Sequence, residues 1–160
     1  MKRPIRVMGD GNCLFNSVSV ALFGSESASM RLRYFTAIEL GVNQESLKKE
    51  FISKKFHYVT EDFEEACKNV CTVGGFSCAW TLMALCNVIK REIVCLYPRI
   101  NGPFDEVAKI LDTTFTPSEV KSKSKVYIMW TSSFTPVLGR TWLPNHFVPL
   151  ENVNGEQFVD

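Results

Sequence analysis

The chain has 160 residues, of which 46% are hydrophobic, and its formal net charge is +1. This length and composition predict a folded domain with a sizeable core and exclude an intrinsically disordered chain. The near-neutral charge argues against a nucleic-acid-binding surface, and no segment is apolar for long enough to span a bilayer.

The N-terminal residues lack the apolar block of a signal peptide. We therefore expect an intracellular protein, cytoplasmic or nuclear, in a reducing compartment. Thiols in such a compartment stay unbridged, and most of the cysteines fall at apolar helix or strand positions. The chain has six of them, at positions 13, 67, 71, 78, 86 and 95.

The first half of the chain predicts one strand followed by four helices. Apolar residues with helical spacing mark the first helix (Leu14, Val18, Ala21–Leu22) and the second (Met30, Tyr34, Ala37–Ile38). A Thr60 cap and acidic residues in the first turn mark the fourth helix. The predicted elements are a strand at 4–8 and helices at 13–23, from Ser27 or Ser29 to 40, at 43–56 and at 60–71.

The second half predicts a loop at 72–77, a central buried helix at 77–90 and then a group of strands. The strands are expected at 92–98, 126–131 and 146–150, with Pro149 placing the last one at or near a sheet edge. The segment 104–125 reads as strand and loop or as a short helix. Helices followed by strands with hairpin-like spacing predict an α+β domain. We expect a single domain over 1–160, with a core at about 4–151 and a C-terminal tail at 152–160.

Cys13 lies at the start of the first predicted helix, directly after a Gly-Asp-Gly-Asn turn. A helix N-terminus favours the thiolate through its dipole and its free backbone N–H groups. The glycines allow a tight turn and leave space for a substrate backbone. The same turn can direct the N–H groups of Gly11, Asn12 and Cys13 at one point, as an oxyanion hole requires.

A thiolate in acyl transfer needs a partner for proton transfer, which is most often a histidine. His57 lies at a helix end beside lysines and reads as a surface residue. His146 lies between turn residues and a strand, from which it can project over a neighbouring helix N-terminus. A lone Cys and a lone His are most often structural, so the Gly-Asp-Gly context of Cys13 is what favours a catalytic pair.

Three stretches together resemble the ovarian-tumour (OTU) family of deubiquitinases. "DGNCLF" resembles the cysteine box of that family, and "NHFVPL" resembles its histidine box. "SCAWTLMALCNVIKREIVCLY" is similar to the helix and strand between them, and the three motifs follow the family order. "CLFNSVSVALFGSE" also resembles OTU-like segments of vertnin-type and transposon-associated proteins.

The resemblance implies a papain-like cysteine protease with a small central β-sheet packed between helical regions. Such an enzyme hydrolyses the bond after the C-terminal Gly of ubiquitin or a ubiquitin-like protein, without a cofactor. By resemblance, Cys13 is the nucleophile, His146 the general base, and Asp10 orders the oxyanion loop or balances the charge near the imidazole. The expected partner is ubiquitin, a polyubiquitin chain or a related modifier, and the domain is expected to be monomeric, with no nucleic-acid or membrane partner.

One position departs from the family pattern. Many family members carry Asp or Asn two residues after the histidine, where this chain has Val148, which cannot orient an imidazole. The orienting group is then Asn145, Asp10, a water or a backbone carbonyl. The departure keeps a second hypothesis open, a catalytically weak or inactive ubiquitin-binding module. A third is a papain-like peptidase for another substrate.

Two further features have alternative interpretations. Cys67, Cys71 and Cys78 lack the close CxxC spacing of a zinc site, so no metal is expected. Trp142, just before the histidine box, either lines a channel for the ubiquitin tail or packs in the core.

Overall fold

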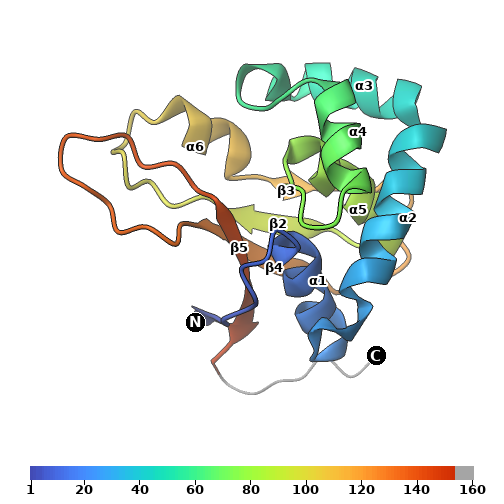
Figure 1. The fold of residues 1–160 in the computed structure, drawn as a ribbon, viewed down its shortest axis with the longest axis horizontal. Helices are drawn as coiled ribbons and strands as arrows, with labels where there is room; N and C mark the ends of the chain where they lie inside the picture. Colours follow the sequence, from blue (N-terminus) through green and yellow to red (C-terminus); the bar gives the residue numbers. More distant parts are fainter. Residues whose placement is uncertain (154–160) are drawn as a thin grey trace.

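The computed structural model describes residues 1–153, so the predicted tail lies outside the described residues from 154 onward. Five strands form one sheet in the order β1-β5-β4-β2-β3, which crosses the middle of the molecule (Figure 1). Regular structure extends slightly beyond the predicted core, because the outermost strand pair joins Lys2 to Asn152. The strands are β1 (Lys2–Pro4), β2 (Ile93–Leu96), β3 (Thr114–Phe115), β4 (Val126–Thr131) and β5 (His146–Asn152).

Six α-helices surround the sheet in the described part of the chain. Helices α2 to α5 gather in one part of the molecule, α6 lies apart from them, and α1 packs against β5 and β4 (Figure 1). This arrangement confirms the α+β prediction with its central sheet. The helices are α1 (Cys13–Phe23), α2 (Ser29–Val42), α3 (Gln44–Ser53), α4 (Phe63–Cys71), α5 (Ala79–Ile89) and α6 (Glu106–Leu111), with short 3-10 turns at Glu26–Ala28 and Phe56–Tyr58.

The sheet is mixed, which corrects the expectation of hairpin-like strand connections. Strand β2 pairs in parallel with β4, whereas β4 and β5 are antiparallel. Parallel neighbours need a crossover connection, and the ambiguous segment 104–125 provides it as α6 and β3. The sequence signal was weak there because these elements are only six and two residues long.

The N-terminal strand lies earlier than predicted, at Lys2–Pro4 in place of 4–8. The register ends at the pair Pro4↔Leu150, after which the Ile5 N–H donates to the Pro149 carbonyl at 2.9 Å. Pro149 has no N–H to continue the ladder, so the chain leaves the sheet there and runs toward α1. Strand β5 is second from the edge, which agrees with the expectation from Pro149.

Helix boundaries follow local chemistry. Gly24 ends α1 in the left-handed conformation, with its N–H donating to the Val20 carbonyl, as predicted. The Thr60 cap was wrong, because the Asp62 carboxylate caps α4 by accepting from the Glu65 N–H at 2.9 Å. An Asp side chain at this position satisfies a free helix N–H.

The buried face of α2 differs from the predicted one. Tyr34 and Ile38 are 62% and 58% exposed, whereas Arg33 and Thr36 are buried. The spacing of apolar residues alone therefore predicted the wrong buried face of α2. Arg33 can be buried on that helix because hydrogen-bond acceptors inside the protein satisfy its guanidinium. Helix α5 is buried along most of its length, as predicted.

The six cysteines are free thiols, as expected. Within residues 1–153, no helix combines the length and apolar character needed to cross a membrane.

Candidate active site

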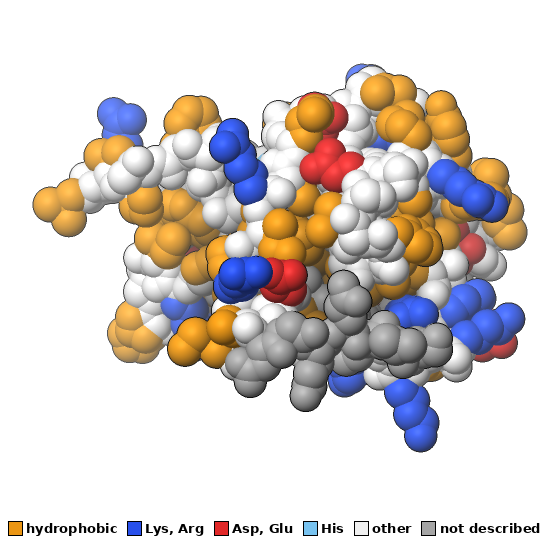
Figure 2. Space-filling view, turned by 90° about the horizontal axis from the view of Figure 1, so that it is seen from below, with side chains coloured by type: hydrophobic (Ala, Val, Ile, Leu, Met, Phe, Trp, Pro, Cys, Tyr) orange, Lys and Arg blue, Asp and Glu red, His pale blue; other side chains and the backbone are white. Residues whose placement is uncertain are grey.

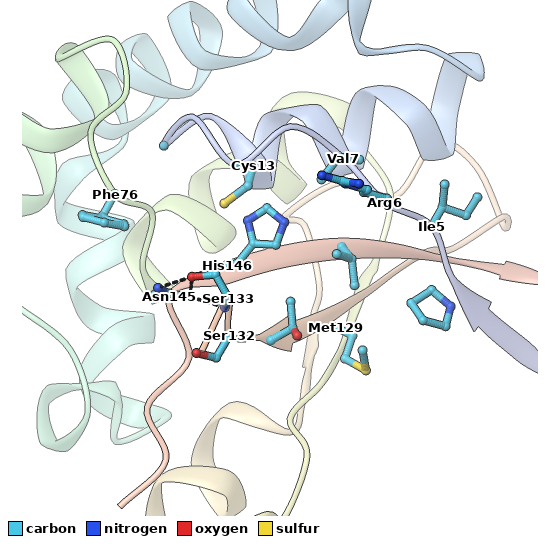
Figure 3. A pocket seen from close by; sticks show the side chains of 15 residues that line it. Ile5, Arg6, Val7, Cys13, Phe76, Met129, Ser132, Ser133, Asn145 and His146 are labelled. Carbon is cyan, nitrogen blue, oxygen red and sulfur yellow. Dashed lines mark hydrogen bonds between the residues drawn. The ribbon is translucent and has the colours of Figure 1, made fainter. Parts of the chain in front are cut away.

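A cavity of about 630 Å³ lies where the N-terminal segment, α1, β4 and β5 meet. Cys13 and His146 both line it, together with Gly9 and Gly11 of the turn and Phe76 of the 72–78 loop. Figure 3 shows the thiol and the imidazole next to each other, with Phe76 on one side of Cys13 and Arg6 and Val7 on the other. The fold therefore brings together two side chains that are 133 positions apart in sequence.

Cys13 is the first residue of α1, and its side chain is largely buried, with 5% of the residue exposed. Burial raises the pKa of the Cys13 thiol, and the Asp10 carboxylate adds to this. The backbone N–H groups of Phe147, Leu14 and Cys13 oppose the shift without cancelling it. At neutral pH the resting site therefore holds a thiol, and attack on a carbonyl requires a group that removes its proton.

His146 is the first residue of β5 and pairs with Thr131 of β4. Burial lowers the pKa of the His146 imidazole, although the Asp10 charge acts in the opposite direction. The imidazole is therefore neutral at neutral pH and able to accept a proton. Among the described residues it has no side-chain hydrogen bond, a common situation before substrate binds.

Asp10 orders the turn that precedes Cys13. Its Oδ1 accepts from the Asn12 N–H at 3.0 Å and from Asn16 Nδ2 at 3.2 Å. Burial raises the pKa of Asp10, but these hydrogen bonds together bring it below its usual value. Because the Asn12 N–H is already bonded to Asp10, it is not a free oxyanion donor in this arrangement. The N–H groups that remain at the start of α1 are those of Cys13 and Leu14.

Gly11 lies in close contact with the 72–78 loop, whereas the sequence predicted that it leaves space for a substrate backbone. Its φ is +79°, and an added Cβ would lie 1.9 Å from the carbonyl oxygen of Gly74. The missing side chain thus makes room for the 72–78 loop and not for a substrate backbone. Gly75 is packed similarly, since its Cβ would lie 2.1 Å from the Asn69 oxygen. Gly11 thus allows the loop to pack against the cysteine turn, and Gly75 allows it to pack against the end of α4.

Arg33 is a component of the site that the sequence interpretation missed. It is 1% exposed, and its Nε donates to Asn12 Oδ1 at 2.9 Å. Its Nη2 donates to the carbonyls of Gly11 and Gly75 at 3.0 and 2.9 Å. The one available signal was its position on α2, three residues before Thr36 and seven before Leu40, which share its buried face.

A second missed residue, Ser17, joins the two halves of the site. Its hydroxyl is fully buried and lies 2.7 Å from the Cys13 carbonyl oxygen and 3.1 Å from that of Phe147. It therefore links the first turn of α1 to the residue that follows His146.

The remaining predicted residues lie around this pair in different roles. Asn145 lines the cavity, but its side chain bonds with Ser133 and not with the imidazole (Figure 3). Val148 lines the same cavity, two positions after His146 on the same side of the strand. Trp142 is buried and packs edge-on against Tyr97, so it occupies the core-packing role of the two left open.

Cys67 and Cys71 lie on α4, and Cys78 is the N-cap residue of α5. In the described portion of the chain, no three His, Cys, Asp or Glu side chains are grouped so that they could hold a metal ion. Burial raises the pKa of Cys78 to about 11, which disfavours the thiolate that a metal needs.

A long segment between β4 and β5, residues 132–145, projects from the body beside the cavity (Figures 1 and 2). Its base contributes Ser132, Ser133 and Asn145 to the cavity lining. Hydrophobic side chains lie at its outer end in Figure 2, where Leu138 is fully exposed. Such a projecting apolar surface is suited to contact with another macromolecule.

Comparisons of sequence identify one protein family. A family model described as "Vertnin, OTU domain" matches residues 4–62 and 45–131. Vertnin of Bos taurus is 25% identical over 182 residues, which cover 96% of this chain and 26% of the relative. Vertnin of Homo sapiens is also 25% identical, over 96% of this chain and 25% of the relative. The chain spans about a quarter of the length of the curated relatives it matches.

Comparisons of structure identify the fold. The structure of the OTUD1 OTU domain is 16% identical, covers 94% of this chain and 86% of that chain, and has a TM-score of 0.61. A structure of an OTU domain in complex with ubiquitin is 12% identical, covers 93% and 69% of the two chains, and has a TM-score of 0.59. The OTU-type α+β fold expected from the three motifs is confirmed.

Proposed function

This chain belongs to the vertnin OTU-domain family, and on that premise we propose that it is a single catalytic domain with thiol-dependent deubiquitinase activity. The proposed substrate is ubiquitin, a polyubiquitin chain or a ubiquitin-like modifier, cleaved after its C-terminal Gly. The observation that carries the proposal is that Cys13 and His146 line one cavity at a helix N-terminus. The complex of a related fold with ubiquitin supports the substrate class.

In the proposed reaction, His146 takes the proton of Cys13, and the thiolate attacks the carbonyl carbon of the terminal Gly. The carbonyl oxygen becomes an anion, which N–H groups at the start of α1 stabilise. The C–N bond then breaks, the imidazolium gives its proton to the leaving amine, and a thioester forms on Cys13. Water activated by the imidazole hydrolyses the thioester and restores the thiol.

The supporting residues have proposed roles that follow from their contacts. Asp10, Gly11 and Asn12 hold the turn that presents the thiol. Asn145 and Ser133 lie at the two ends of the projecting segment, and the hydrogen bonds between them fix the start of β5. His146 is thus placed by its strand, and no side chain within residues 1–153 forms a hydrogen bond with its ring.

The test is a ubiquitin probe with a C-terminal electrophile, alongside equivalent probes built on ubiquitin-like modifiers. The wild-type chain should form a covalent adduct that Cys13→Ala abolishes and His146→Ala slows by about 100-fold or more. A panel of di-ubiquitin linkages should be cleaved by the wild type and not by His146→Ala. If no probe labels the folded wild type, the proposed activity is excluded.

A second candidate is a ubiquitin-binding module without turnover. The observations that favour it are Val148 at the position of an orienting residue and the raised pKa of the Cys13 thiol. This candidate predicts that ubiquitin binds wild type and Cys13→Ala equally, that no adduct forms, and that no chain is cut. Titration of ubiquitin against both proteins separates the two candidates.

A further inference from the structure

Resting on the proposed function, we propose that Arg33 is a positioning residue of the site. It clamps the turn that carries Cys13 to the 72–78 loop, and it supplies a buried positive charge that favours the anions formed there. Arg33 does not line the cavity, so its proposed role is exerted through the segments that it binds and not by contact with the substrate.

The contacts of Arg33 connect two separate segments. On the turn, the guanidinium donates to the Gly11 carbonyl and to the Asn12 side chain. On the other segment, Nη2 donates to the Gly75 carbonyl, and Nη1 donates to three carbonyls at the end of α4 and the start of the loop. Those three are the carbonyls of Asn69, Val70 and Thr72, at 3.1, 3.2 and 2.9 Å.

The clamp connects two segments that contribute to the cavity lining. Gly11 and Asn12 directly precede Cys13, while Gly75 directly precedes Phe76, and both Cys13 and Phe76 line the cavity. Asn12 Oδ1 also accepts a longer bond from the Gly74 N–H, at 3.4 Å. A planar guanidinium fixes such a set of acceptors in one geometry, which the single ammonium of a lysine does not do.

The acceptors of Arg33 are all neutral oxygens. Over residues 1–153, no carboxylate forms a salt bridge with it, and its charge faces carbonyl dipoles and the ring of Phe15 at 4.6 Å. Burial lowers the pKa of Arg33, whereas its charge interactions with the Asp10 carboxylate and with the ionised form of Cys13 raise it. Arginine remains protonated in proteins, so an incompletely neutralised cation lies close to the thiol.

Two variants separate the charge from the geometry. Arg33→Lys keeps the positive charge and loses the planar set of donors, whereas Arg33→Gln loses both. Arg31→Lys and Arg31→Gln are matched controls, because Arg31 lies on the same helix and is exposed. The first readout is alkylation of Cys13 by iodoacetamide as a function of pH, resolved by mass spectrometry of the Cys13 peptide. The second is kcat and KM for a fluorogenic ubiquitin C-terminal amide.

The expected results differ between the variants. Arg33→Gln should move the alkylation midpoint of Cys13 to higher pH, and Arg33→Lys should leave it close to the wild-type value. Both should lower kcat by about 100-fold, as expected for a misplaced catalytic group, with KM changed by less than about threefold. Both Arg31 variants should match the wild type. Equal midpoints for Gln and Lys, or an unchanged kcat in either folded variant, would overturn the proposal.

The alkylation readout needs no ubiquitin, so it still tests Arg33 if the proposed function fails. If neither Arg33 variant folds, Asn12→Ala removes the acceptor of Nε and leaves Arg33 in place. Hydrogen exchange of the Asn12 variant should then increase at residues 9–13 and 72–76. Unchanged exchange in both segments would refute the clamp.

Discussion

The two halves of the candidate site are held in different ways. Cys13 sits on a turn fixed by Asp10, by Arg33 and by the close contact of Gly11 with Gly74. The imidazole of His146, in contrast, has no side-chain hydrogen bond among the described residues, and its place depends on the pairing of β5 with β4. Several independent contacts therefore fix the position of the thiol, whereas the position of the imidazole depends on the strand that carries it.

This difference indicates where the site tolerates change. A side chain held by several independent contacts loses its position only when a close approach or the central clamp is removed. A side chain held by its strand alone has a free ring that a new hydrogen bond can still orient. Substitutions that disrupt the contacts of the thiol side should therefore reduce activity, whereas an added hydrogen bond on the imidazole side should increase it.

Gly11→Ala should have the largest effect. The new Cβ would lie 1.9 Å from the Gly74 oxygen at a φ of +79°, so both the backbone conformation and the loop contact would be strained. We expect a loss of about 3 kcal/mol or more in the free energy of unfolding. We also expect loss of labelling by the ubiquitin probe, measured together with denaturant unfolding.

Gly24→Ala is the matched control for this substitution. Gly24 has a similar φ of +72°, but no atom lies within 4 Å of its added Cβ. Gly24→Ala should lower the free energy of unfolding only by the cost of the left-handed conformation, about 1 to 2 kcal/mol. Its labelling by the ubiquitin probe should be unchanged. Equal losses in the two variants would show that the contact with Gly74 does not stabilise the thiol side.

Val148→Asn should improve the imidazole half. Val148 lies on the same side of β5 as His146, and an amide oxygen there can accept from a ring N–H. We expect a gain of about tenfold in kcat, a small part of what a well-placed base contributes. The cost is about 1 to 3 kcal/mol of stability, because a polar group enters a buried position.

Val148→Ala controls for the lost packing. It should lose stability without any gain in kcat for the fluorogenic ubiquitin amide. If Val148→Asn folds and its kcat stays at the wild-type level, the imidazole is already oriented, and the contrast between the two halves is wrong.

The sequence was sufficient to predict the fold class, and Cys13 and His146, which it predicted as a pair, line one cavity. Strand β4 was predicted with the bounds it has, and the end of α1 at Gly24 follows from a glycine stop. The crossover between β2 and β4 could not be predicted, because two- and six-residue elements carry too little periodicity. The end of β1 depended on Pro149, a residue far away in sequence.

The supporting residues of the site were harder to predict than Cys13 and His146. Arg33 was missed because most of its acceptors are backbone carbonyls from two distant segments, and every residue type has a backbone carbonyl, so the sequence does not mark them. Ser17 was missed for the same reason. Motifs report the side chains that perform chemistry, whereas long-range contacts with the backbone become visible only in the folded chain.

Asp10→Asn should change the pH dependence of the site with little change in its geometry. Both hydrogen bonds of the Asp10 side chain reach one oxygen, Oδ1, which asparagine retains. The carboxylate raises the pKa of both Cys13 and His146. Its neutralisation should therefore move both titrations to lower pH, as followed by alkylation of Cys13 and by NMR of the imidazole.

Asp10→Ala provides the contrast, because it removes the acceptor as well as the charge. It should destabilise the turn and reduce probe labelling well below the level of Asp10→Asn. Equal labelling by the two variants would mean that the carboxylate acts on the site through its charge alone.

Ser17→Ala should have the smallest effect and tests the link between the halves. The hydroxyl lies within hydrogen-bond distance of carbonyls on α1 and β5, so its loss should cost about 1 kcal/mol. Thr36→Val is the control, since Thr36 is also buried and donates only to the Leu32 carbonyl of its own helix. Both variants should lose similar stability in denaturant unfolding, but only Ser17→Ala should slow probe labelling, by about threefold. Equal labelling rates would show that β5 holds His146 without help from α1, which would make the imidazole half independent of the turn that carries the thiol.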